Sequence, residues 1–203
     1  MKEPIWEENN FERLSTFLEK ENVMPTSILT NQDHNIYPYY FSEQFPDSHI
    51  ITFTKNPQNA EPILQEDFRS EVLDITNNKE LEKIVKNYKI DFIYTSDLLD
   101  HLNFFWGGES VADTLAENEV KWILFLHDSK NEKDKLERSL PYFTFLEKIK
   151  YHGYKVRRLF NYLNPDYPNY YLAKSPIKTK QFSLEEVFRI QINKNLAKIP
   201  TPA

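Results

Sequence analysis

Short apolar runs alternate with amphipathic segments along most of this chain. The runs, rich in β-branched and aromatic residues, predict strands at 26–30, 48–54, 71–75, 91–95 and 121–126. Helical spacing of apolar residues predicts helices at about 9–18, 36–45, 77–88, 110–118 and 141–152. Strands that alternate with helices form a mostly parallel sheet with helices on both faces. We therefore expect a doubly wound α/β fold.

Local signals refine the ends of these elements. Capping patterns at Asn9 and Asn77 predict helix starts, and Gly153 is placed to end a helix in the left-handed conformation. The segments 154–162 and 167–173 flank an Asn-Pro-Asp turn cluster and predict an antiparallel hairpin. The expected sheet therefore has seven strands and ends in a C-terminal hairpin.

Length and charge narrow the class of protein. A chain of 203 residues buries roughly 70% of its unfolded surface, so we expect one domain over 1–203, with a leading helix and a C-terminal helix at 183–198. A net charge of -6 offers no broad basic field, which argues against a nucleic-acid partner. We see no apolar signal core and no membrane-length run, and expect a cytoplasmic protein without a membrane partner. Zero cysteines exclude disulfides and thiolate sites.

Clusters of acids and histidine follow two of the predicted strands. The fourth strand runs into Ser96-Asp-Leu-Leu-Asp-His101, and the fifth runs into His127-Asp128-Ser129. Ligands of open α/β sheets bind beyond the carboxyl ends of the strands, so these clusters mark the expected site. Asp and His also cap helices and close turns, and that structural role is the alternative interpretation.

The element order resembles the Rossmann-like fold of class I S-adenosylmethionine-dependent methyltransferases over about residues 9–176. In that family a Gly-rich loop follows the first strand and an acid ends the second, whereas this chain has Asn31-Gln-Asp-His-Asn35 and Thr54-Lys55-Asn56. Asp74 matches the family's acid after the third strand, which often contacts adenine. The resemblance implies S-adenosylmethionine as cofactor, with Thr30, Asn31, Asp74 and Asp97 as cofactor-binding residues.

The two polar clusters resemble the Asp-x-x-His and His-Asp-Ser pattern of small-molecule and sugar methyltransferases. The resemblance implies His127, Asp128 and His101 as catalytic residues, with His127 as general base and Asp128 orienting it, or with both as metal ligands. Asp100, His127 and Asp128 are the candidate metal ligands. Nitrogen ligands would favour zinc, and carboxylates would favour magnesium or manganese.

Two functions of different classes remain open. One is a divergent methyltransferase for a hydroxyl or amine of a small molecule or sugar, with metal assistance as an option. The other is a methyltransferase-like scaffold or partner-binding subunit that has lost the cofactor, its crevice filled by Tyr37, Tyr39 or Tyr40. Metal-dependent hydrolysis or hydroxylation ranks third. We also consider a lid over residues 104–108, against a loop anchored by buried aromatics, and a homodimer formed through the Tyr-rich hairpin.

Overall fold

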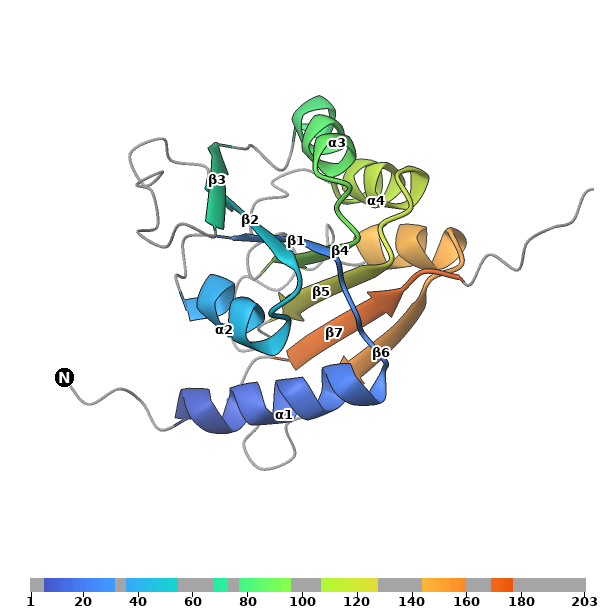
Figure 1. The fold of residues 1–203 in the computed structure, drawn as a ribbon. Helices are drawn as coiled ribbons and strands as arrows, with labels where there is room; N and C mark the ends of the chain where they lie inside the picture. Colours follow the sequence, from blue (N-terminus) through green and yellow to red (C-terminus); the bar gives the residue numbers. More distant parts are fainter. Residues whose placement is uncertain are drawn as a thin grey trace, which may run out of the picture.

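In the described part of the chain, seven strands form one mixed sheet in the order β3-β2-β1-β4-β5-β7-β6 (Figure 1). The computed structural model describes residues 6–31, 36–54, 68–72, 77–95, 107–127, 144–159 and 169–176. The strands are β1 (Ser27–Asn31), β2 (His49–Thr54), β3 (Phe68–Val72), β4 (Phe92–Thr95), β5 (Trp122–His127), β6 (Lys155–Leu159) and β7 (Asn169–Lys174). Strands β1 to β5 are parallel, whereas β7 runs antiparallel to both β5 and β6. The predicted mostly parallel α/β fold is confirmed.

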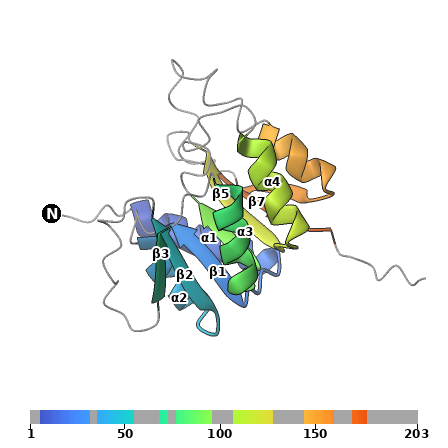
Figure 2. The ribbon, with the colours of Figure 1, turned by 90° about the horizontal axis from the view of Figure 1, so that it is seen from above.

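Helices cover both faces of the sheet. The labelled helices are α1 (Trp6–Lys20), α2 (Ile36–Gln44), α3 (Asn78–Asn87) and α4 (Gly107–Glu117), and a further helix spans 144–151. Helices α1 and α2 lie below the sheet in Figure 1, and α3, α4 and the 144–151 helix lie above it. The view from above in Figure 2 shows α3 and α4 crossing over the central strands. The domain therefore has three layers, as a doubly wound sheet requires.

Side chains that alternate along the strands feed two separate cores. On β4, Phe92 and Tyr94 join the core between the sheet and helices α1 and α2. Ile93 joins the core between the sheet and helices α3 and α4. Every residue of β1 is buried, because a central parallel strand is covered on both faces. This burial explains why the strands read as continuous apolar runs.

Helix starts and the third strand differ in detail from the sequence prediction. Asn77 caps α3 as predicted, and its side chain accepts a hydrogen bond from the Lys79 amide at 3.2 Å. Helix α1 begins at Trp6, so the start predicted at Asn9 is wrong by one turn. Strand β3 spans 68–72 and pairs with β2 from Ile50–Phe68 to Thr54–Val72, so the start predicted at residue 71 is wrong by three residues; 73–75 lie outside the described residues. Pairing with a neighbouring strand decided this register, and local propensity did not.

Two predictions about glycine have different outcomes. Gly153 ends the 144–151 helix at φ +85°, the left-handed conformation predicted for it. Gly107 and Gly108 are the first residues of α4, three residues before the helix start predicted at 110, and the lid over 104–108 stays a prediction. Residues 104–106 and the predicted C-terminal helix at 183–198 lie outside the described residues. No helix among the described residues is long and apolar enough to span a membrane.

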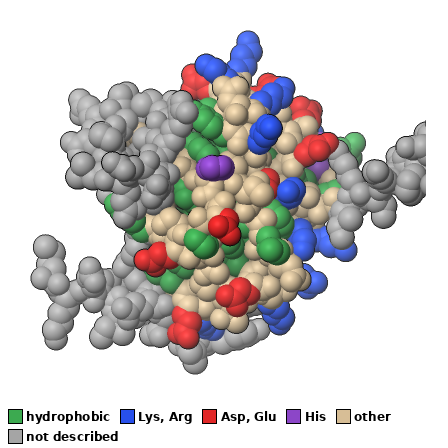
Figure 3. Space-filling model, viewed as in Figure 1, with side chains coloured by type: hydrophobic (Ala, Val, Ile, Leu, Met, Phe, Trp, Pro, Cys, Tyr) green, Lys and Arg blue, Asp and Glu red, His purple; other side chains and the backbone are tan. Residues whose placement is uncertain are grey.

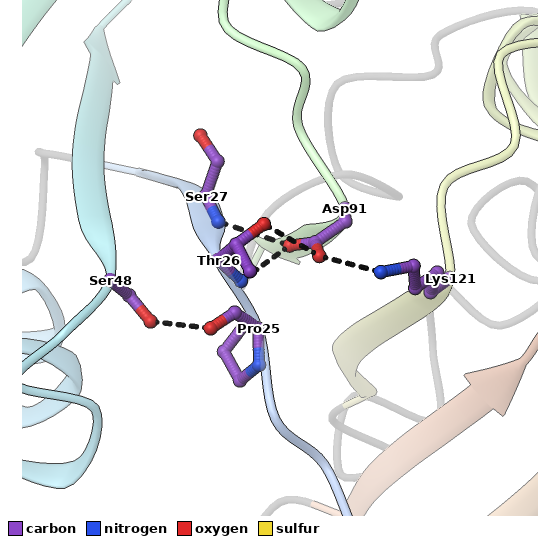
Figure 4. A network of polar contacts seen from close by, with 6 residues as sticks. All are labelled: Pro25, Thr26, Ser27, Ser48, Asp91 and Lys121. Atoms are coloured by element: carbon purple, nitrogen blue, oxygen red, sulfur yellow. Dashed lines mark hydrogen bonds and ion pairs between the residues drawn. The ribbon is translucent and has the colours of Figure 1, made fainter.

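A buried carboxylate joins the amino ends of three strands. Asp91 Oδ1 accepts hydrogen bonds from the backbone amides of Thr26 at 2.9 Å and Ser27 at 3.0 Å. Its Oδ2 accepts from the Thr26 hydroxyl at 3.0 Å and from Lys121 Nζ at 3.1 Å (Figure 4). The network connects the residues that precede β1, β4 and β5. It fixes the edge of the sheet opposite to the one where the sequence places the site.

Candidate functional site

The carboxyl ends of the parallel strands lie at one edge of the sheet. Polar residues end four of these strands, at Asn31, Thr54, Thr95 and His127. Strand pairing determines how far each strand extends at this edge. Thr30 pairs with Tyr94, so β1 and β4 end at the same height, at Asn31 and Thr95. Thr95 pairs with Phe125, so β5 continues two residues further to His127. The chain thus brings polar residues from separate segments to the edge where such sheets bind ligands.

The described residues include part of the predicted site. Asn31 is buried, with 2% of its surface exposed, at the end of β1. Thr30 is fully buried on the α2 side of the sheet, so its backbone is the part nearest to a ligand at the edge. His127 ends β5 and pairs with Asn169 of β7. The other predicted residues, Asp74, Asp97, Asp100, His101 and Asp128, lie outside the described residues, and so does His34.

Buried hydroxyl groups run across the sheet just behind this edge. Thr30 of β1 pairs with Thr52 of β2, and both side chains are 0% exposed. Within the described part of the chain, neither hydroxyl has a hydrogen-bond partner. A buried hydroxyl without a partner costs about 1–3 kcal/mol of stability. These two threonine side chains lie inside the core behind the edge, and they have no exposed surface with which to contact a ligand.

Three tyrosines from distant segments meet between α2 and the sheet. The Tyr37 ring lies 4.4 Å from the Tyr94 ring, centroid to centroid, and its hydroxyl lies 3.0 Å from that of Tyr170. Phe11 of α1 packs edge-on against Tyr37 with ring centroids 5.6 Å apart. Sequence reasoning named Tyr37 as a residue that fills the crevice, but it did not place Tyr94 or Tyr170 beside it. No sequence signal could have done so, because the three come from α2, β4 and β7.

The neighbouring tyrosines of α2 differ in exposure. Tyr40 stacks on Phe11 at 4.5 Å between centroids, and its hydroxyl lies 2.9 Å from that of Ser15. Burial raises the pKa of Tyr40 to about 12, so the side chain is neutral at physiological pH. Tyr39 is 37% exposed and points away from the core. Tyr37 and Tyr40 therefore belong to the packing between α1, α2 and the sheet.

The described residues do not make a metal centre. Within them, no group of three or more His, Asp or Glu side chains is arranged to hold a metal ion. Of the three predicted metal ligands, the structure describes the position of His127 alone. The metal prediction therefore stays a prediction.

Strand order and helix arrangement together give this chain the fold of the class I S-adenosylmethionine-dependent methyltransferases, as the sequence resemblance implied. The N-methyltransferase NodS from Bradyrhizobium japonicum WM9 superposes with a TM-score of 0.56 at 10% identity, over 83% of this chain and 98% of that chain. The methyltransferase domain of bacterial CtHen1 gives 0.56 at 10% identity, over 82% and 98%. The Methanococcus jannaschii fibrillarin pre-rRNA processing protein gives 0.51 at 12% identity, over 74% and 66%.

Sequence comparison adds nothing to this structural likeness. No protein-family model and no curated protein sequence matches the chain. At 10–12% identity the structural likeness shows the fold alone. Any activity has to be argued from the site.

Proposed function

We propose that this protein is a divergent S-adenosylmethionine-dependent methyltransferase acting on a hydroxyl or amine of a small molecule or sugar. One observation carries the proposal: a sheet of methyltransferase strand order whose β1, β2, β4 and β5 end in polar residues at the ligand-binding edge. A cofactor bound at this edge would lie beside polar residues from four strands, where ligands of open α/β sheets bind.

Asn31 suits the place of the glycine that this chain lacks. Its side-chain amide can both donate and accept hydrogen bonds. In the proposal the backbone of Thr30 and the side chains of Asn31, Asp74 and Asp97 hold the cofactor, which supplies an electrophilic methyl group. Asp74 would bind the adenine amino group.

The proposed chemistry at the substrate uses the residues after β4 and β5. His127 would accept the proton of the substrate hydroxyl or amine, Asp128 would orient its ring, and His101 would assist from the neighbouring loop. In a metal-assisted version, Asp100, His127 and Asp128 would hold a divalent cation that lowers the pKa of a substrate hydroxyl.

A second function is favoured by the tyrosine packing. Tyr37 is held between Tyr94, Tyr170 and Phe11, so the first turn of α2 is fixed against the sheet by aromatic contacts. In methyltransferases of this fold the turn before this helix is where the backbone approaches the cofactor. A domain that fills this region with aromatic side chains would serve as a scaffold or partner-binding subunit.

Calorimetric titration with S-adenosylmethionine and S-adenosylhomocysteine, with and without magnesium, manganese or zinc, separates the two functions. The methyltransferase proposal expects micromolar affinity that weakens in Asn31→Ala and Asp74→Ala. The control is Asp47→Ala, an exposed position in the turn before β2. No binding under any condition, with all variants folded, would contradict the proposal and leave the scaffold. Binding of metal alone would point to hydrolysis or hydroxylation.

A further inference from the structure

A cavity of about 410 Å³ lies at the amino edge of the parallel strands, opposite to the proposed methyltransferase site. Its apolar walls include Trp122, Tyr154 and Pro176. Its basic lining residues are Lys121, Lys174 and His152, and Glu119 is its acidic one. Ligand sites for small molecules occupy roughly 300–1,000 Å³ and combine mostly apolar walls with a few polar groups. Size and lining both fit such a site.

The walls of this cavity are rigidly held. Tyr154 donates a hydrogen bond to the Val120 carbonyl oxygen at 2.5 Å, and burial raises its pKa, so the side chain stays neutral. Trp122 is 8% exposed and packs in the core between the sheet and helices α1 and α2. Gly153 lies close to Pro176, since a Cβ built on it would lie 3.4 Å from Pro176 Cγ. The shape of the cavity is therefore set by the fold itself.

Lys174 lines the cavity, and a second lysine lies beside it in the sheet. Lys155 of β6 and Lys174 of β7 are antiparallel register partners, and like charges in this arrangement destabilise a sheet. Lys174 Nζ donates to the backbone oxygen of Glu21 at 2.9 Å, an acceptor without net charge. Lys121 Nζ forms an ion pair with Asp91 Oδ2 at 3.1 Å. Among the described residues, no acidic side chain forms an ion pair with Lys155 or Lys174, so the positive charge of the two lysines is not offset there.

Figure 3 shows Lys and Arg side chains on one face of the molecule. Lys and Arg side chains gather at the right of the molecule, over the end of α1 and the adjoining ends of β6 and β7. The chain as a whole has a net charge of -6. A local positive field in an acidic protein attracts anions to that spot.

We propose that this amino-edge cavity binds a small molecule with a flat apolar body and one carboxylate group. The apolar body would lie between Trp122, Tyr154 and Pro176, and the carboxylate would lie toward Lys174 and Lys155. Ionised hydrogen bonds of the ammonium–carboxylate type are stronger than neutral ones, so the carboxylate relieves the repulsion between the lysines. The site is separate from the cofactor edge, and it does not rest on the proposed methyltransferase activity.

The test uses 2-naphthoate and its neutral analogue 2-naphthamide as probes of the full chain. Titration is followed by calorimetry and by the indole N–H resonance of Trp122 in a proton–nitrogen NMR spectrum, which is assigned with Trp122→Phe. For a probe of this size we expect a Kd of about 1 mM for the carboxylate. The neutral analogue should bind about threefold to tenfold more weakly, because it lacks the ion pair.

Charge variants decide whether the lysines hold the carboxylate. Lys174→Gln combined with Lys155→Gln should weaken 2-naphthoate about tenfold and leave 2-naphthamide unchanged, since only the ion pairs are removed. Lys83→Gln on the exposed face of α3 is the control of equal side-chain chemistry and should change neither affinity. The proposal is overturned if 2-naphthoate fails to shift the Trp122 resonance, or if the folded lysine variant binds it as tightly as the unchanged protein.

Discussion

Replacing Asp91 by alanine should destabilise this protein by about 2–4 kcal/mol, although Asp91 lies far from the proposed active site. The carboxylate accepts four hydrogen bonds, two of them from backbone amides at the start of β1 (Figure 4). Ser27 is 5% exposed, so its amide would be left without a partner at a cost of about 1–3 kcal/mol. Thr26 is exposed, so water can replace part of the hydrogen bonding that its amide and hydroxyl lose.

The ion pair to Lys121 adds little to this total. The Lys121 side chain is 54% exposed, and exposed pairs contribute about 0.2–1 kcal/mol. Asp91→Asn keeps an acceptor oxygen for the two backbone amides and loses the negative charge, so we expect it to cost about 1 kcal/mol. Lys121→Gln should cost less than either Asp91 variant.

Urea unfolding followed by circular dichroism measures these differences. The midpoint should fall while the m-value stays constant, since the surface exposed on unfolding does not change. Asp47→Ala is the matched control, because Asp47 is exposed. If Asp91→Ala costs no more than Asp47→Ala, then the buried carboxylate does not hold the three strands together and the reasoning is refuted.

Three further predictions concern the tyrosines and Gly153. A double-mutant cycle of Tyr37→Phe and Tyr170→Phe should give a coupling free energy of about 0.5–1.5 kcal/mol from their hydroxyl contact, and a coupling of zero by urea unfolding would show that the hydroxyls act independently. Gly153→Ala should cost about 1 kcal/mol because its φ is +85°, and an unchanged unfolding midpoint would contradict this. Between pH 10 and about 12 the native protein retains the Tyr40 proton that the unfolded chain releases, so stability should fall as pH rises through this window. Tyr40→Phe should make that fall shallower, measured by urea unfolding across the window, and an unaltered slope would rule out the effect.

The sequence indicated the fold class through features that are local. Apolar runs about as long as a strand alternate with helical spacing, and this pattern predicted a doubly wound sheet. A glycine just after a predicted helix predicted the left-handed turn at Gly153. The polar residue that ends β5, His127, was also visible as the first residue after an apolar run. These inferences succeed because burial of a strand or of a helix face leaves a period in the sequence itself.

Tertiary structure decided everything that depends on partners distant along the chain. The register of β3 follows from its pairing with β2, and the meeting of Tyr37, Tyr94 and Tyr170 follows from the packing of α2 on the sheet. Asp91 appeared in the sequence only as the first residue of a strand, and its role at three strand ends was not readable. Side chains 60 or more residues apart meet because the strands order themselves as β3-β2-β1-β4-β5-β7-β6. That order is set by burial of both faces of the sheet at once, which no local period records.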